Sequence, residues 1–212
     1  MPLEKVGDWE LARKILPGLD KRVARAVDVA IRQEAHYLRK QILKGFGAGG
    51  AVGGKWAAHS ALTLAIRKFT GNRKSKLLQQ SGDLRNSIQV VDQDGGVYVG
   101  VNRAAASSSG LGITHLASIH EFGASFVVVM TDRQRRFLMA ALSAAGVLRD
   151  QPKGRGGSRG GGTIHITIPA RPFIGPVMKA YAQPDQLARS VLDRVATILE
   201  GQLGKASGRP RE

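Results

Sequence analysis

The sequence contains no cysteine, which excludes a disulfide framework and any thiolate nucleophile. Aromatic residues are scarce as well, at 5% of the 212 residues, so few side chains are available to stack on nucleobases. Acidic residues are outnumbered, because 16 Asp and Glu stand against 32 Lys and Arg, a formal net charge of +16. This excess favours a polyanionic partner, nucleic acid first and an anionic membrane surface second. It is equally consistent with basic residues that keep a glycine-rich chain in solution or contact an acidic protein.

Long apolar segments and catalytic motifs are also missing. The longest apolar stretch, residues 137–148, is too short to span a bilayer, and the charged N-terminus MPLEKVGDWELARK lacks the apolar core of a signal peptide. We therefore expect a soluble intracellular protein. The chain has no GxSxG nucleophile motif, its carboxylates are scattered, and its five histidines lack metal-ligand spacing. These absences predict a protein that is no enzyme and that binds no metal and no cofactor.

Helical periodicity appears at both ends of the chain. From Leu19 to about Gly45, apolar residues recur every three or four positions, which predicts one long amphipathic helix. A short helix capped by Asp8 is expected before it, and another is expected at residues 62–69. Pro184 suits the first turn of a last helix, which is expected to be followed by a disordered tail at residues 205–212. The apolar side of this last helix is expected to consist of Leu187, Val191, Val195, Ile198 and Leu199.

Strand periodicity appears between these helices. Residues 88–102 alternate on both sides of a turn at residues 92–96, which predicts a β-hairpin that follows a turn at residues 81–83. Further strands are predicted near residues 126–130 and 164–168, and Thr131 and Asp132 can cap a helix between them. The fold class is therefore α+β, with a small, mainly antiparallel sheet packed against the long N-terminal helix and the C-terminal helix. We expect a single domain over residues 1–204, with flexible loops at residues 45–55, 103–112 and 149–162.

Two segments match parts of known functional motifs. Residues 45–55 contain the spacings GxGxxG and GxxxxGK, but a phosphate-binding loop needs a preceding strand and a Ser or Thr where Trp56 stands. His120 and Glu121 begin a zinc-protease pattern, yet Ala124 occupies the position of its second histidine. The alternative is structural: Leu116, Ile119 and Phe122 would pack a short helix under the hairpin, and Gly123 would end that helix.

Two basic stretches are candidates for contact with DNA or with a partner. Cations placed this close together attract phosphates without reading bases, but they can also face an acidic neighbour. The sequence leaves both possibilities open. The candidate residues are Arg67, Lys68, Arg73, Lys74 and Lys76 in the first stretch, and Lys153, Arg155 and Arg159 in the second, which contains no apolar residue.

Four short motifs occur in a fixed order along the chain: LLQQSGDLRNSI from Leu77, VYVGVN from Val97, IHEFGA from Ile119 and IPARPFIG from Ile168. Together they resemble the tail-completion, or virion-morphogenesis, proteins of tailed bacteriophages such as Mu-like and lambda-like phages. The resemblance covers roughly residues 56–180. It identifies the following positions as structural motif residues: Trp56, Leu78, Gly82, Leu84, Arg85, Ile88, Gly100, His120, Glu121, Phe122, Gly123, Pro169, Arg171, Pro172 and Phe173.

The resemblance implies a virion structural protein that completes the phage tail or neck and joins tail to head. It implies a ring of identical subunits, with a hexamer expected, around the DNA exit channel. Neighbouring neck, connector or tail-tube proteins would be its partners, with weak sequence-independent DNA contact and no membrane. Its location would be the virion, after assembly in the host bacterial cytoplasm. Alternatives are a head-proximal neck adaptor, a tail terminator, or a sequence-independent nucleic-acid-binding protein.

Overall fold

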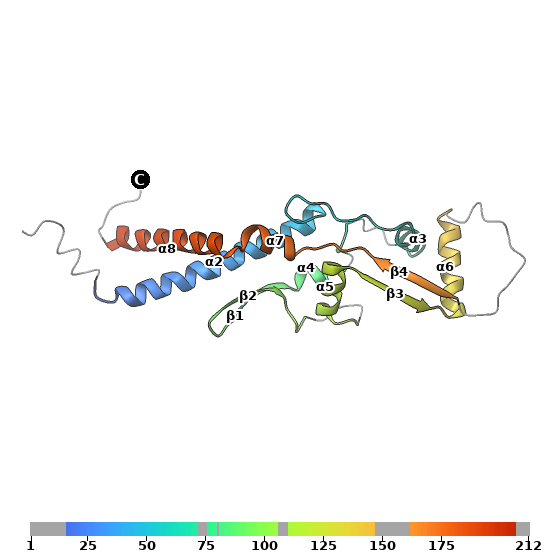
Figure 1. Ribbon diagram of the computed structural model, residues 1–212, viewed down its shortest axis with the longest axis horizontal. Coiled ribbons are helices and arrows are strands. Elements are labelled where there is room, and N and C mark those ends of the chain that lie inside the picture. Colours follow the sequence, from blue (N-terminus) through green and yellow to red (C-terminus); the bar gives the residue numbers. More distant parts are fainter. Residues whose placement is uncertain (1–15, 72–75, 80, 106–109, 147–161, 207–212) are drawn as a thin grey trace, which may run out of the picture. The chain divides into compact units, whose positions relative to one another are not determined.

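The structure of the protein is a computed structural model that describes residues 16–71, 76–79, 81–105, 110–146 and 162–206 (Figure 1). Helices and strands are both present, so the predicted α+β class is confirmed. The strands are β1 (Ile88–Gln93), β2 (Gly96–Val101), β3 (Ala124–Val129) and β4 (Thr163–Ile168). The helices are α2 (Leu19–Ala48), α3 (Ala61–Phe69), α4 (Asp83–Asn86), α5 (Ile113–Phe122), α6 (Asp132–Ala144), α7 (Gly175–Tyr181) and α8 (Pro184–Ala206).

The four strands form two pairs instead of one sheet. Within the described residues, β1 pairs with β2 in one two-stranded sheet and β3 pairs with β4 in another. Contacts divide the chain into two compact units. Unit 1 comprises Met1–Lys40, Val90–Val99 and Met178–Glu212, and unit 2 comprises Gln41–Gln89 and Gly100–Val177. The single domain expected from the sequence stays a prediction.

Unit 1 is built on the packing of α2 against α8. Ala26 and Ala30 of α2 are buried together with Val195 of α8, and the partly buried Val191 and Ile198 pack against them. This arrangement confirms the apolar side predicted for the last helix. The helix itself continues to Ala206, slightly beyond the predicted start of the tail at residue 205.

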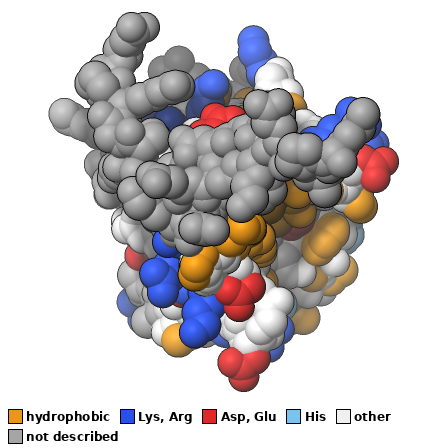
Figure 2. Space-filling view, turned by 90° about the vertical axis from the view of Figure 1, so that its left-hand side faces the viewer, with side chains coloured by type: hydrophobic (Ala, Val, Ile, Leu, Met, Phe, Trp, Pro, Cys, Tyr) orange, Lys and Arg blue, Asp and Glu red, His pale blue; other side chains and the backbone are white. Residues whose placement is uncertain are grey.

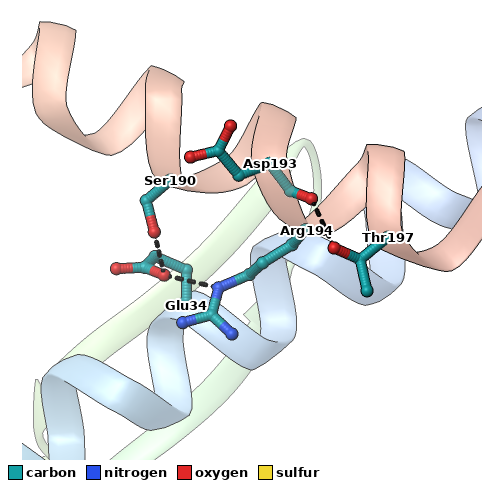
Figure 3. Close-up of polar contacts among 5 residues, drawn as sticks. All are labelled: Glu34, Ser190, Asp193, Arg194 and Thr197. Atoms are coloured by element: carbon teal, nitrogen blue, oxygen red, sulfur yellow. Dashed lines mark hydrogen bonds and ion pairs between the residues drawn. The ribbon is translucent and has the colours of Figure 1, made fainter.

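A buried carboxylate joins the same two helices (Figure 3). Glu34 on α2 is only 3% exposed, and its Oε2 accepts hydrogen bonds from Ser190 Oγ and Arg194 Nε on α8, both at 2.7 Å. The Arg194 guanidinium also lies 6.0 Å from the centre of the Tyr37 ring. Because a buried charge is costly without partners, these bonds favour one alignment of α2 with α8. The exposed ion pair between Arg32 and Asp92, at 3.2 Å, contributes little because water screens it.

In unit 2, β3 and β4 run antiparallel from the Ala124–Ile168 pair to the Val129–Thr163 pair. Val128 and Ile164 are opposite each other in this register and line an apolar groove of about 360 Å³ together with residues of α3 and α6. Across these two helices, the Phe69 and Phe137 rings meet edge to face at 5.4 Å. The predicted cap of α6 is confirmed, because the Thr131 hydroxyl and the Gln134 side chain form a capping box.

The glycine-rich segment differs from its predicted boundaries. The sequence predicted that the long helix ends near Gly45 and that residues 45–55 form a loop, but α2 continues to Ala48. Helical hydrogen bonding satisfies the backbone there, so the glycines weaken the helix without ending it. The turn that follows is tight, since a Cβ atom on Gly50 would lie 1.7 Å from the Gly54 carbonyl oxygen. Only glycine fits that position.

Two further expectations are corrected. After a turn at residues 81–83, Leu84 and Arg85 were expected to lead into the first strand, but Asp83–Asn86 form the short helix α4. Phe122 was expected to pack inward, yet its side chain is 79% exposed. The reason is the helical period: nine residues separate Phe122 from the buried Ile113, which places them on opposite sides of α5.

Some expectations fall on residues that the structure does not describe. These are the helix capped by Asp8, most of the loop at residues 149–162, the middle of the loop at residues 103–112, and most of the C-terminal tail. Among the described residues, no helix combines the length and apolar character needed to cross a membrane.

Candidate functional site

The motifs IHEFGA and IPARPFIG are joined by a carboxylate. Glu121 lies in the last turn of α5, and its Oε2 accepts hydrogen bonds from the backbone N–H groups of Phe173, at 2.9 Å, and Ile174, at 3.1 Å. Its Oε1 accepts a third bond, at 2.6 Å, from the N–H of Gly175, the first residue of α7. The first N–H groups of a helix have no partner within the helix, so Glu121 caps α7 from a distant part of the chain.

The backbones of the same two motifs also touch. The Arg171 N–H donates a hydrogen bond of 2.6 Å to the His120 carbonyl oxygen. Gly123, at φ 79°, passes so close to the other motif that an added Cβ would lie 3.0 Å from the Ile168 carbonyl oxygen and 3.0 Å from the Ala170 nitrogen. A side chain at position 123 would therefore be strained and crowded. The prediction that Gly123 ends the short helix is confirmed.

Arg171 connects these motifs to the segment that follows the glycine-rich turn. The residue is 7% exposed, and its guanidinium donates hydrogen bonds to the carbonyl oxygens of Ala57, at 2.8 Å, and Ala58, at 3.0 Å. In the opposite direction, Trp56 Nε1 donates to the Pro172 carbonyl oxygen at 2.8 Å. Three hydrogen bonds thus hold residues 56–58 against residues 171–172.

An aromatic cluster of Phe46, Trp56 and Phe173 lies beneath this junction. Phe46 meets Trp56 at 5.6 Å and Phe173 at 5.3 Å between ring centres, both in edge-on geometry. The exposed fractions are 1% for Phe46, 8% for Trp56 and 0% for Phe173. All three residues therefore belong to the buried core. Sequence reasoning missed Phe46, although a lone aromatic between two glycines was a usable signal.

The motif LLQQSGDLRNSI forms the base of the hairpin. Leu84 and Ile88 are buried, at 4% and 0% exposure. The buried Ser87, which sequence reasoning also missed, donates its hydroxyl to the Leu84 carbonyl oxygen, and its own carbonyl accepts from the Asn102 N–H. The other positions divide by exposure: Gly100 is buried, Leu78, Gly82 and Pro172 are half-buried, and Arg85 and Pro169 are exposed.

A basic cleft of about 710 Å³ lies beside the junction. Its described lining includes His59, Arg67, His120, His165 and Arg171, and no Asp or Glu. Burial lowers the pKa of His120, and the charge of Arg171 lowers it further. Burial also lowers the pKa of Arg171, with a contribution from Arg67. Both shifts have the direction expected where positive charge is desolvated beside another cation.

Comparison with known families decides what kind of protein carries this junction. The sequence model of the phage virion morphogenesis family matches residues 8–193. The chain belongs to the phage virion morphogenesis family. Searches among curated proteins and among solved structures gave no match. Since the matched range contains all four motifs, this virion morphogenesis protein has a structural role in phage virion assembly.

The basic residues of this virion morphogenesis protein are placed only in part. Arg67 is half-buried on α3 and lines the cleft, whereas Lys68 and Lys76 are exposed. On the face drawn in Figure 2, Lys and Arg side chains are scattered among acidic and hydrophobic ones. The remaining candidates, Arg73, Lys74, Lys153, Arg155 and Arg159, lie outside the described residues. The structure therefore brings together Arg67 and Arg171, which are far apart in sequence, and leaves the other candidate contacts as predictions.

In this virion morphogenesis protein, neither partial motif lies in the structural context that its function would require. A helix, α2, precedes the glycine-rich segment instead of the strand that a phosphate-binding loop requires. Glu121, the second residue of the zinc-protease pattern, accepts hydrogen bonds from the backbone N–H groups of residues 173–175. Across the described ranges, no cluster of three or more His, Asp or Glu residues could hold a metal ion.

Proposed function

We propose that this virion morphogenesis protein completes the phage tail or neck and joins tail to head, as a ring of identical subunits around the DNA exit channel. The observation that carries the proposal is the family match over residues 8–193. In this proposal the protein acts by binding, without catalysis or a cofactor. Its partners are its own copies, with a hexamer expected, and the adjoining neck, connector or tail-tube proteins.

The distribution of side chains supports a role in assembly. Most motif residues are engaged in internal contacts, such as the Glu121 cap and the aromatic cluster. Large apolar side chains nevertheless remain exposed, including Phe122 at 79%, Val129 at 70% and Val127 at 62%. Exposed apolar residues of this kind are typical of surfaces that contact other proteins. A single interface repeated around a rotation axis would close such subunits into a ring.

Loss of the gene tests this function in the phage or prophage that carries it. We expect a nonsense mutant to accumulate separate heads and tails in electron micrographs, with a titre lower by orders of magnitude, because unjoined particles cannot deliver DNA. Wild-type protein supplied from a plasmid should restore joining. Overlong tails would favour the tail-terminator alternative, and heads that lose their DNA would favour the neck adaptor. Mutant particles that join and infect normally would overturn the proposal.

The position of the ring can be tested in the same particles. A label on the C-terminus should appear in averaged micrographs as rotationally symmetric density at the end of the tail nearest the head. Density elsewhere, or a single copy per particle, would contradict a ring at the neck.

We also expect weak DNA binding that does not depend on sequence. Tight binding would oppose DNA ejection, and the low aromatic content offers few stacking partners for bases. If each protomer neutralises about four phosphates, raising salt from about 50 to 200 mM should weaken binding about 100-fold. Fluorescence anisotropy with two unrelated labelled duplexes measures this, and the double variant Lys68→Ala, Lys76→Ala should flatten the salt dependence. Strong binding that salt does not change would contradict the expectation.

A further inference from the structure

The basic cleft runs along one edge of β4. Four consecutive β4 residues line it: His165, Ile166, Thr167 and Ile168. The side chains of successive strand residues point to opposite faces of a sheet. Four consecutive residues can therefore line the same cavity only if that cavity follows the edge of the strand. The other edge of β4 is paired with β3. Among the described residues, none outside β3 forms a backbone hydrogen bond with β4, so this edge offers backbone donors and acceptors to a further strand.

The cleft also holds buried positive charge, and no Asp or Glu is among the described residues that line it. Arg171 is 7% exposed, and its guanidinium contacts the carbonyl oxygens of Ala57 and Ala58, which accept hydrogen bonds but do not neutralise the charge. His120 Nδ1 is buried and has no hydrogen-bond partner among the described residues. Buried charged and polar groups normally have partners. An anionic oxygen in the cleft would supply a counter-charge for Arg171.

The remaining walls distinguish between possible occupants. Apolar side chains line the cleft beside the basic ones, among them Leu62, Leu84 and Leu116, whereas no Phe, Tyr or Trp is among the described lining residues. The large aromatic rings on which nucleobases stack best are thus missing from the described lining, which disfavours a nucleic acid. An extended peptide matches all three features: its backbone pairs with the edge, its apolar side chains meet the leucines, and its carboxylates meet the cations. The volume is also within the range of ligand-binding clefts, about 300–1,000 Å³.

We propose that this cleft binds an extended acidic segment of a neighbouring virion protein, which adds to the edge of β4 opposite β3 as a further strand. Only the origin of the segment rests on the proposed function. The binding itself follows from the edge, the cations and the apolar wall. The undescribed part of the chain between α6 and β4 is an unsuitable occupant, since Arg149, Lys153, Arg155 and Arg159 give it the same sign of charge as the cleft.

A defined peptide tests the proposal on the full-length protein. The probe is a capped heptapeptide in which valine and glutamate alternate, and its control has lysine in place of glutamate. In NMR titrations we expect the acidic peptide to shift the amide signals of residues 164–168 and the imidazole signals of His120. Its affinity should exceed that of the lysine peptide at least tenfold. Equal binding of the two peptides, or shifts confined to other residues, would overturn the proposal.

Two matched pairs of variants locate the binding. Arg67→Glu should weaken binding of the acidic peptide at least tenfold, whereas Lys68→Glu, the exposed neighbour outside the cleft lining, should not. Arg67 also contacts His59, at 2.9 Å, so a second pair guards against misfolding. His165→Asp on β4 should weaken binding, whereas Thr163→Asp, also exposed on β4 but outside the lining, should leave it unchanged. Circular dichroism checks that each variant is folded, and folded variants that all bind normally would exclude the cleft.

Competition separates a peptide site from a phosphate site. Inorganic phosphate and a short DNA duplex at matched ionic strength should not displace the acidic peptide. Displacement by either, with the same residues shifted, would assign the cleft to phosphate and overturn the peptide proposal. The outcome is independent of the genetic test. If the cleft fails to bind the peptide, the proposed role in joining heads to tails is unaffected. If phage without the gene still join heads to tails, the proposed peptide binding is unaffected.

Discussion

Replacing Phe173 with alanine is expected to lower the free energy of unfolding by about 4 kcal/mol. The side chain has 0% exposure and contacts Phe46, which in turn contacts Trp56, so its removal leaves a cavity in the aromatic cluster. The rigid backbone around the cluster, fixed by the Trp56 and Arg171 hydrogen bonds, limits how far the site can collapse. Since a domain is stabilised by only about 5–15 kcal/mol in total, the variant should be unfolded or temperature-sensitive. Urea unfolding followed by tryptophan fluorescence measures the loss.

Phe122→Ala is the matched control, because the same atoms are removed from a side chain that is 79% exposed. Its effect on the free energy of unfolding should be within about 0.5 kcal/mol. If both variants lose the same stability, the aromatic cluster is not the core of unit 2. In the phage, Phe173→Ala should block joining of heads and tails at high growth temperature and permit it at low temperature, because the loss acts through folding.

Local rules account for the elements that the sequence predicts well. The C-terminal helix has an unbroken apolar period, and the structure buries Val195 on that side. Thr131 caps α6 and Gly123 ends α5, both through contacts within a few residues. The long helix also begins at the predicted Leu19, but its end was misplaced. Glycine lowers helix propensity by only about 1 kcal/mol, an amount that the hydrogen-bonded turn after Ala48 can offset.

Contacts between distant residues could not be predicted in this way. The bonds of Glu121 cross 52 to 54 residues of sequence, and the bond from Arg171 to Ala57 crosses 114. No periodicity encodes such partners. The family resemblance marked Glu121 and Arg171 as structural residues, but only the three-dimensional arrangement shows that one caps α7 and the other holds residues 57–58.

The same limit applies to the basic residues. Arg67 was grouped with its sequence neighbours as one cationic stretch, because charge counts along a chain reflect only proximity in sequence. In the structure, Arg67 and Arg171 line one cleft with His120, and their mutual repulsion contributes to the lowered pKa of Arg171. Lys68, the next residue, lies outside that lining. Burial and the path of β4, rather than the number of cations, thus define the candidate binding site.

The second large effect is expected for Glu121→Ala, which should lower the free energy of unfolding by about 3 kcal/mol. The substitution removes the acceptor for three backbone N–H groups, two just before α7 and one at its first residue. Phe173 is buried, so its N–H has poor access to water, whereas Gly175 is exposed and its N–H can be hydrated. The loss is therefore smaller than three fully buried hydrogen bonds would suggest. Thermal and urea unfolding measure it, and hydrogen exchange should show faster exchange at Phe173 and Ile174.

Glu121→Gln separates charge from shape at the same position. Glutamine keeps one oxygen, which can still accept from Phe173 and Ile174, but its NH₂ group then faces the Gly175 N–H. The expected loss is about half that of Glu121→Ala, roughly 1.5 kcal/mol. Glu200→Ala on α8 is the control, since Glu200 is exposed and its removal should change stability by less than about 0.5 kcal/mol. If Glu121→Ala behaves like Glu200→Ala, water replaces the carboxylate without cost, and Glu121 does not hold α7 in place.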